Sequence, residues 1–195
     1  MNLFEIQSIE NIYNSWKKCK DNHSYIENIH NTQIILSKDN FLPENQIDTN
    51  KRTIYFDKCE NLDIIVHEKF NHILLVNCNN INLHIISGLI SGLDILHCRN
   101  INIHIQNNKI NFTEMSDCEN CAYKYNNLDD IDNIDDTNNT DNNFYINTNS
   151  CYNIDFIIFN KNISTNKSYF AEKKYFIINK NCIKCYNEFG IEYLI

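Results

Sequence analysis

Two Cys-x-x-Cys pairs carry the side chains of this sequence that are best suited to chemistry: Cys118 with Cys121, and Cys182 with Cys185. Four thiolates can bind zinc tetrahedrally, so the two pairs could share one ion. Zinc ribbons separate their pairs by about 15–20 residues, and the separation here is far larger. A redox role for the second pair would need a helix N-terminus to lower a thiol pKa, and no helical pattern is visible there. The sequence therefore favours structural thiols, with no metal.

His84 and His104 are the second candidate set, because they occupy equivalent places in two similar segments. If these segments stack as neighbouring strands about 4.8 Å apart, the two rings nearly touch. A pair of imidazoles could bind a metal ion, but a solvated pair on an outer face is the interpretation that we favour. No Ser-His-Asp order is present. With Gly at 3, a phosphate-binding loop is close to excluded. We expect no catalytic residue and no cofactor.

An acidic stretch over 126–143 is the third candidate. It consists largely of Asn, Asp and Thr, and this low complexity predicts a disordered loop. The loop could contact a basic partner or hold a divalent ion loosely. A tolerated insertion at a coil corner is the interpretation that we favour.

The overall composition limits the class of protein. The chain has 195 residues, 43% of them hydrophobic, which is enough to bury a core. The net charge of -8 argues against nucleic-acid binding, which needs clustered Lys and Arg. The N-terminus lacks the pattern of a signal peptide, and no run approaches the roughly 18 apolar residues of a membrane span. We therefore expect a cytoplasmic protein with reduced cysteines and no membrane partner.

A repeated Cys-x-Asn unit organises the chain. Five segments begin with it, at Cys59, Cys78, Cys98, Cys118 and Cys151, of which the Cys118 segment reads Cys-Glu-Asn-Cys. The intervals are 19, 20, 20 and 33 residues, and removing about 14 residues of the acidic stretch restores the period. A fixed period of about 20 residues indicates that each repeat is one coil of a solenoid.

Each coil has the pattern of β-strands. Apolar residues alternate with polar ones over 81–85 and 101–105, so that one set faces a core. A second strand precedes each Cys, at 73–76 and 93–96. The sequence predicts an all-β fold, a short right-handed parallel β-helix of about 20-residue coils. At the corners Cys is a small, readily buried residue, Asn tolerates a turn, and both should stack as ladders from coil to coil.

The two ends of the chain depart from the repeat. Residues Ile6, Ile9, Tyr13 and Trp16 fall on one face of a helix, which we expect over 3–20. We divide the chain into an N-terminal helix and linker (1–50), the β-helix (51–168) and a C-terminal cap or hairpin (169–195). A solenoid end would otherwise expose an unpaired edge.

Four motifs, in this order and spacing, point to a family. They are Asp-Lys-Cys-Glu-Asn at 57–61, the double-glycine turn at 86–92, His-Cys-Arg-Asn at 97–100 and Ser-Cys-Tyr-Asn-Ile-Asp-Phe at 150–156. With them, residues 56–159 resemble the C-terminal domain of tubulin-binding cofactor C and of its relative, the retinitis-pigmentosa GTPase-activating protein. That β-helix fold is shared with the actin-binding C-terminal domain of cyclase-associated proteins.

The resemblance implies a role in tubulin folding or on a tubulin-like or small GTPase. In that family a Gln-x-Arg motif supplies an arginine finger, which stabilises charge on the transferred phosphate. The alignment puts Lys109 at the Gln and Asn111 at the Arg, so the finger is missing. The resemblance thus implies a binding module and not an enzyme, with Lys109, Asn111, Thr113 and Arg99 as its partner-binding residues. Arg99 lies at a coil corner and is otherwise read as a surface residue.

Two alternatives stay open. The first is an actin-monomer-binding domain of the cyclase-associated type, which could pair into a homodimer through the C-terminal segment from Tyr169. The second is a weak GTPase activator that uses Lys109, although an ammonium lacks the planar fork of a guanidinium. Each of these readings predicts a cytoskeleton-associated protein.

Overall fold

The computed structural model describes residues 23–37, 48–106, 110, 112–125, 144–158, 161–164, 174–178, 183–187 and 192–194. The helix expected over 3–20 and the acidic stretch 126–143 lie outside the described residues. Within them, helical structure is confined to one short 3-10 turn, η1 (Thr49–Lys51). The all-β prediction is confirmed.

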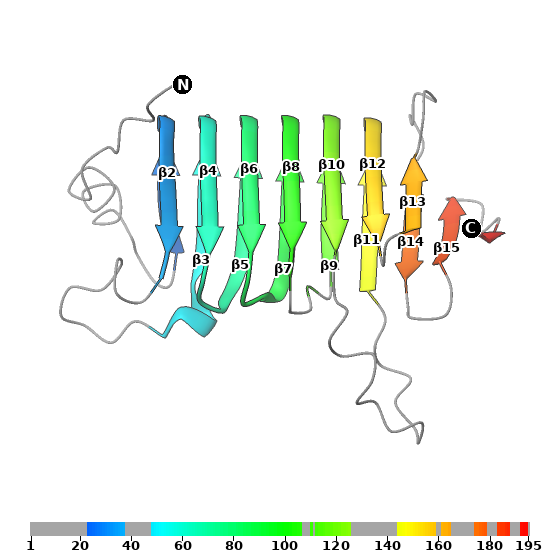
Figure 1. Ribbon diagram of the computed structural model, residues 1–195, viewed down its shortest axis with the longest axis horizontal. Coiled ribbons are helices and arrows are strands. Elements are labelled where there is room, and N and C mark those ends of the chain that lie inside the picture. The colour runs from blue at the N-terminus through cyan, green and yellow to red at the C-terminus, as the bar shows by residue number, and fades with distance from the viewer. Residues whose placement is uncertain are drawn as a thin grey trace, which may run out of the picture.

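Two parallel sheets lie face to face and the chain alternates between them (Figure 1). The front sheet contains β2 (His30–Leu36), β4 (Glu60–Val66), β6 (Asn79–Ile85), β8 (Arg99–Ile105), β10 (Glu119–Tyr125) and β12 (Tyr152–Ile158). The back sheet contains β1 (His23–Glu27), β3 (Thr53–Asp57), β5 (Phe70–Val76), β7 (Leu89–Leu96), β9 (Phe112–Ser116) and β11 (Phe144–Asn149). Front strands run down and back strands run up as the chain advances from left to right, which is a right-handed path. Each coil therefore has one strand in each sheet.

The first coil corrects the predicted linker. Strands β1 and β2 fall within 1–50, yet β1 pairs with β3 and β2 pairs with β4, both in parallel. The side chains of Ile26 and Ile34 are buried in the same core as the later coils. This coil lacks the cysteine by which the repeat was recognised, because Ile29 stands in its place.

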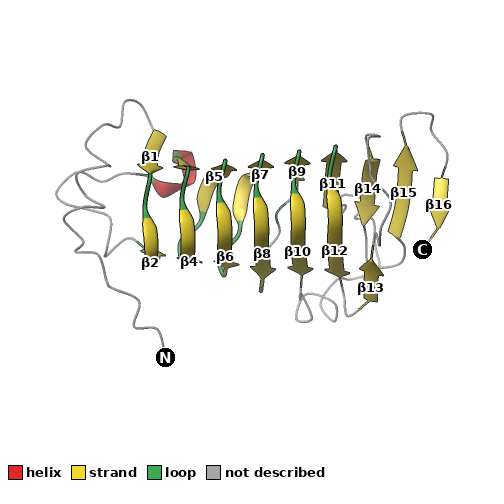
Figure 2. Ribbon diagram, turned by 90° about the horizontal axis from the view of Figure 1, so that it is seen from above, coloured by secondary structure: helices red, strands yellow, loops and turns green. Residues whose placement is uncertain are grey.

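Antiparallel strands extend both sheets at the C-terminal end (Figure 2). Strand β13 (Lys161–Ser164) pairs with β12, and β14 (Lys174–Ile178) pairs with β11. Strands β15 (Ile183–Asn187) and β16 (Glu192–Leu194) follow as a meander on β14. The last parallel edges are thus covered by strands of the same chain, three of which come from the segment expected to be a cap or hairpin.

The core lies between the two sheets and follows the predicted alternation. Ile81, Leu83 and Ile85 are all fully buried, while His84 between them is exposed. Opposite them, Ile73 and Leu75 point inward from β5. Because the side-chain period of a strand is two, each strand gives one set of residues to the core and the other to the surface.

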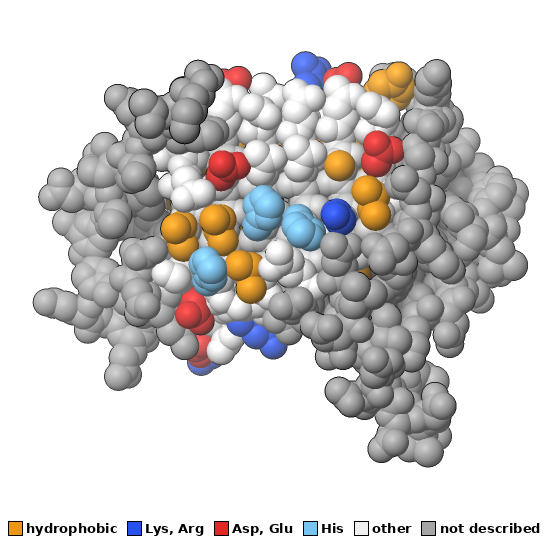
Figure 3. Space-filling model, in the orientation of Figure 1, with side chains coloured by type: hydrophobic (Ala, Val, Ile, Leu, Met, Phe, Trp, Pro, Cys, Tyr) orange, Lys and Arg blue, Asp and Glu red, His pale blue; other side chains and the backbone are white. Residues whose placement is uncertain are grey.

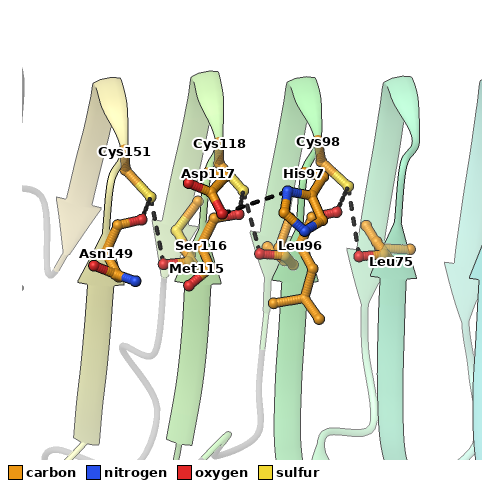
Figure 4. Close-up of polar contacts among 11 residues, drawn as sticks. Leu75, Leu96, His97, Cys98, Met115, Ser116, Asp117, Cys118, Asn149 and Cys151 are labelled. Atoms are coloured by element: carbon orange, nitrogen blue, oxygen red, sulfur yellow. Dashed lines mark hydrogen bonds and ion pairs between the residues drawn. The ribbon is translucent and has the colours of Figure 1, made fainter. Parts of the chain in front are cut away.

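The cysteines form the predicted ladder at one corner (Figure 4). All five corner cysteines are at most 2% exposed. Each thiol lies within hydrogen-bonding distance of two carbonyl oxygens, one from its own coil and one from the preceding coil. Cys98 Sγ, for example, is 3.2 Å from the Leu96 oxygen and 3.5 Å from the Leu75 oxygen. These thiols are structural, as the repeat predicted.

Each corner turns sharply because two of its residues adopt the left-handed backbone conformation. The Asn of Cys-x-Asn has a φ near +54°, and so does the residue before each cysteine. The sequence predicted the first of these conformations but not the second, because the preceding residue is not a consistent type: Lys58, Asn77, His97, Asp117 and Ser150. For residues other than Gly, Asn and Asp this conformation costs about 1–2 kcal/mol.

Candidate interaction surface

The four residues that the resemblance assigned to partner binding do not gather in one place. Thr113 is fully buried in β9, and its Oγ1 lies 3.3 Å from the hydroxyl of Tyr123. Its side chain points into the core because 113 is an inward position of its strand. Arg99 is exposed at the cysteine corner, with Nε 3.3 Å from Glu119 Oε2. Lys109 and Asn111 lie outside the described residues, so their part in partner binding stays a prediction, as does that of Arg99.

Arg99 borders an open depression of about 700 Å³ on the corner. Its other lining residues are Asp117, Cys118, Glu119, Ser150, Cys151 and Tyr152. The carboxylates are already engaged in part, because Asp117 Oδ2 lies 3.4 Å from His97 Nδ1 and Glu119 pairs with Arg99. The depression is therefore lined by one arginine and two carboxylates, and each of these groups already has a partner in the same chain.

The outer side of the front sheet is the most regular surface of the protein, and we call it the front face. It carries three rows of side chains that cross the strands. The row next to the corner consists of Asn31, Asn61, Asn80, Asn100, Asn120 and Asn153. The middle row consists of Gln33, Asp63, Asn82, Asn102, Ala122 and Asp155. The third row consists of Ile35, Ile65, His84, His104, Lys124 and Ile157.

Amide side chains of the first two rows hydrogen-bond from strand to strand. Asn61 Nδ2 donates to Asn31 Oδ1 at 2.9 Å, and Asn80 Nδ2 donates to Asn61 Oδ1 at 2.6 Å. In the middle row, Asn82 and Asn102 continue the pattern at 2.8 and 3.0 Å. Such ladders fix the rotamers before any partner arrives, and this lowers the entropic cost of binding.

The third row is only weakly charged (Figure 3). The half-buried Ile35 and Ile65 lie at one end, and the two imidazoles occupy the middle. Burial lowers the pKa of His104, and the neighbouring Lys124 and His84 lower it further. The neutral imidazole is therefore favoured near neutral pH, leaving Lys124 as the fixed charge of the row.

A flat, rigid and mixed polar and apolar face is the kind of surface that a protein partner covers. Within the described residues no group of three or more His, Cys, Asp and Glu gathers to hold a metal. The alternation in the sequence predicted which residues of each single strand face outward, but not how they line up from strand to strand. Aligning the coils at the second, fourth and sixth positions after each cysteine would have shown the rows, but the hydrogen bonds between them needed the structure.

The fold is that of a parallel β-helical domain. Residues 14–123, more than half of the chain, match the family described as adenylate cyclase associated (CAP) C terminal, and the chain belongs to that family. The crystal structure of cyclase-associated protein from Cryptosporidium parvum is similar, with a TM-score of 0.52 over 91% of this chain and 92% of that chain. At 17% sequence identity this likeness shows the fold alone.

A search among curated proteins found no match. The sequence resembles two related families, and the family match supports the cyclase-associated C terminus. The cofactor C assignment has no support beyond the fold that the two families share. No helix in the part of the chain that the structure describes is long and apolar enough to cross a membrane.

Proposed function

We propose that this domain binds actin monomers and has no catalytic activity of its own. The observation that carries the proposal is that the chain belongs to the cyclase-associated C-terminal family. The resemblance of the sequence to that family implies actin binding. The front face supports it physically, because its amide ladders and half-buried isoleucines offer a rigid surface of the mixed character that protein interfaces have.

The tubulin reading has weaker support. It came from the cofactor C resemblance, and the family that matches is the cyclase-associated one. Weak GTPase activation through Lys109 is likewise a prediction without a described side chain behind it. Both readings are tested by measuring GTP hydrolysis by tubulin with and without the protein, where strong stimulation abolished by Lys109→Ala would favour the activator over the actin-binding module.

A homodimer through the C-terminal segment is a further part of the proposal. Strands β14, β15 and β16 continue the back sheet beyond the last coil as an antiparallel meander. Strands at the end of a sheet present unpaired backbone groups that a second copy can complete. Light scattering on the purified protein should give twice the mass of the chain, and a strict monomer at micromolar concentration would contradict pairing.

The direct experiment compares two partners in one format. Fluorescently labelled actin monomers and tubulin dimers are each titrated with the protein at physiological salt. We expect saturable binding to actin and none to tubulin at the same concentrations. Saturable binding to tubulin alone would overturn the proposal.

A further inference from the structure

Two imidazoles stand side by side on the front face. Strands β6 and β8 pair in parallel with His84 directly opposite His104, and the ring centroids are 5.7 Å apart with an interplanar angle of 70°. A zinc–imidazole bond is about 2.0–2.1 Å long, which puts an ion about 3 Å from the centre of each ring that binds it. Because the nitrogen lone pair lies in the plane of the ring, two centroids 5.7 Å apart allow one ion to bind both rings where the two ring planes cross.

The two rings are not committed elsewhere as other histidines are. His30, His72 and His97 each lie within 4.0 Å of a carboxylate oxygen. His104 Nε2, in contrast, is shielded from solvent and makes no hydrogen bond. A shielded polar atom without a partner costs free energy, and a metal ion bound at that nitrogen would satisfy it.

The surroundings of His104 leave its ring in the form that binds metals. Burial keeps the pKa of His104 low, so its ring is neutral near pH 7 and has a lone pair to donate. Lys124 follows on the next strand, in register with His104. Its positive charge opposes a cation, so the site should be of moderate affinity.

We propose that His84 and His104 together bind one divalent transition-metal ion of the borderline class, such as Ni²⁺ or Zn²⁺, on the exposed front face. Imidazole suits these ions. The site supplies two protein ligands, and water fills the other positions. The site is open to water on the side of the exposed His84 ring, unlike the closed four-ligand sites that stabilise folds. This inference is independent of actin binding.

Calorimetric titration of the full chain with NiCl₂ tests the site. We expect one ion to bind, and His84→Ala and His104→Ala should each weaken that binding at least about tenfold, since even the loss of an outer-shell partner costs this much. His30→Ala is the matched control, because His30 lies on the same sheet but pairs with Glu60. A Cys182→Ser, Cys185→Ser background separates any binding by that thiol pair.

A substitution of Lys124 should strengthen metal binding, whereas the histidine substitutions should weaken it. Replacing it by Glu removes the opposing charge and places a carboxylate on the third strand of the row, so Lys124→Glu should bind Ni²⁺ several-fold more tightly than the wild type. Circular dichroism shows whether each variant is folded, and Ni²⁺ should raise the melting temperature of the wild type but not of folded His84→Ala. Binding that is unchanged in both histidine variants, or lost equally in His30→Ala, would overturn the site.

Discussion

The thiol of Cys118 lies 3.2 Å from the carbonyl oxygen of Ile95, which belongs to the preceding coil. The same relationship recurs at Cys98 with Leu75 and at Cys151 with Met115. Backbone ladders join the coils along each sheet, and the thiols join them again at the corner. The cysteine repeat is therefore a device that holds successive coils in register.

Removing one thiol should weaken the stack. Cys98→Ala leaves a small void at a fully buried position and removes the thiol donor from the Leu75 and Leu96 oxygens, the second of which still accepts from the Asn77 N–H. We expect a loss of about 1–2 kcal/mol in the free energy of unfolding, measured by urea denaturation. Glu114→Ala, at an outward position of β9, is the control and should change stability little. Equal stability of Cys98→Ala and wild type would show that the ladder is incidental.

The thiol ladder also predicts sensitivity to alkali. Hydrogen bonding to Cys121, together with burial, raises the pKa of Cys118 from 9.0 to about 12, although the bond to Cys151 lowers it. The folded state thus holds this proton more tightly than the unfolded state. Its contribution to stability is complete below pH 9 and is lost as the pH rises toward 12.

The measurement is the free energy of unfolding at pH 7, 9 and 10.5 for wild type and Cys118→Ala. The wild type should lose stability more steeply over the upper interval, because the variant has no proton to release at this position. Parallel curves would contradict the raised pKa. At pH 8 the same thiol should resist iodoacetamide until the protein is denatured.

Gly92 is required by a close approach between strands. Its φ is +133°, which L-residues rarely adopt, and a methyl group at its Cα would overlap the carbonyl oxygen of Phe112. Gly92→Ala should therefore cost about 2–3 kcal/mol. Gly88→Ala, where φ is +81°, should cost only about 1 kcal/mol. Thermal melts of both variants test the order, and a smaller loss at Gly92 would contradict the clash.

A substitution of the residue before a corner cysteine can stabilise the fold. Lys58 has a φ of +54°, and its ammonium lies 3.8 Å from Asp57 in an exposed ion pair of little energetic weight. Asn tolerates this conformation better than Lys. Lys58→Asn should raise the free energy of unfolding by about 0.5–1 kcal/mol. Lys51→Asn, outside the corners, is the control, and a drop in stability at Lys58 would count against the account of the corner.

Much of the fold was predictable from the repeat, because Cys-x-Asn marks each corner and alternation marks each front strand, as at Ile81 and Leu83. The first coil was missed since Ile29 replaces its cysteine. The residues predicted to bind a partner could not be placed from the sequence in the same way. Thr113 was chosen from a motif position, and only the register of β9 shows that it points inward, toward Tyr123. Strand pairing decides which residues of separate coils become neighbours, and the repeat showed that pairing for His84 and His104 but not for Thr113.

The proposal that the front face binds an actin monomer is tested most directly by a pair of matched substitutions. Ile65→Glu puts a carboxylate in the third row of the front face, whereas Ile90→Glu makes the same change at an exposed position of β7. Both variants are titrated against labelled actin monomers after circular dichroism confirms that they are folded. The account predicts that Ile65→Glu weakens binding at least about fivefold, or about 1 kcal/mol, and that Ile90→Glu binds like wild type. Equal affinity of Ile65→Glu and wild type would contradict it.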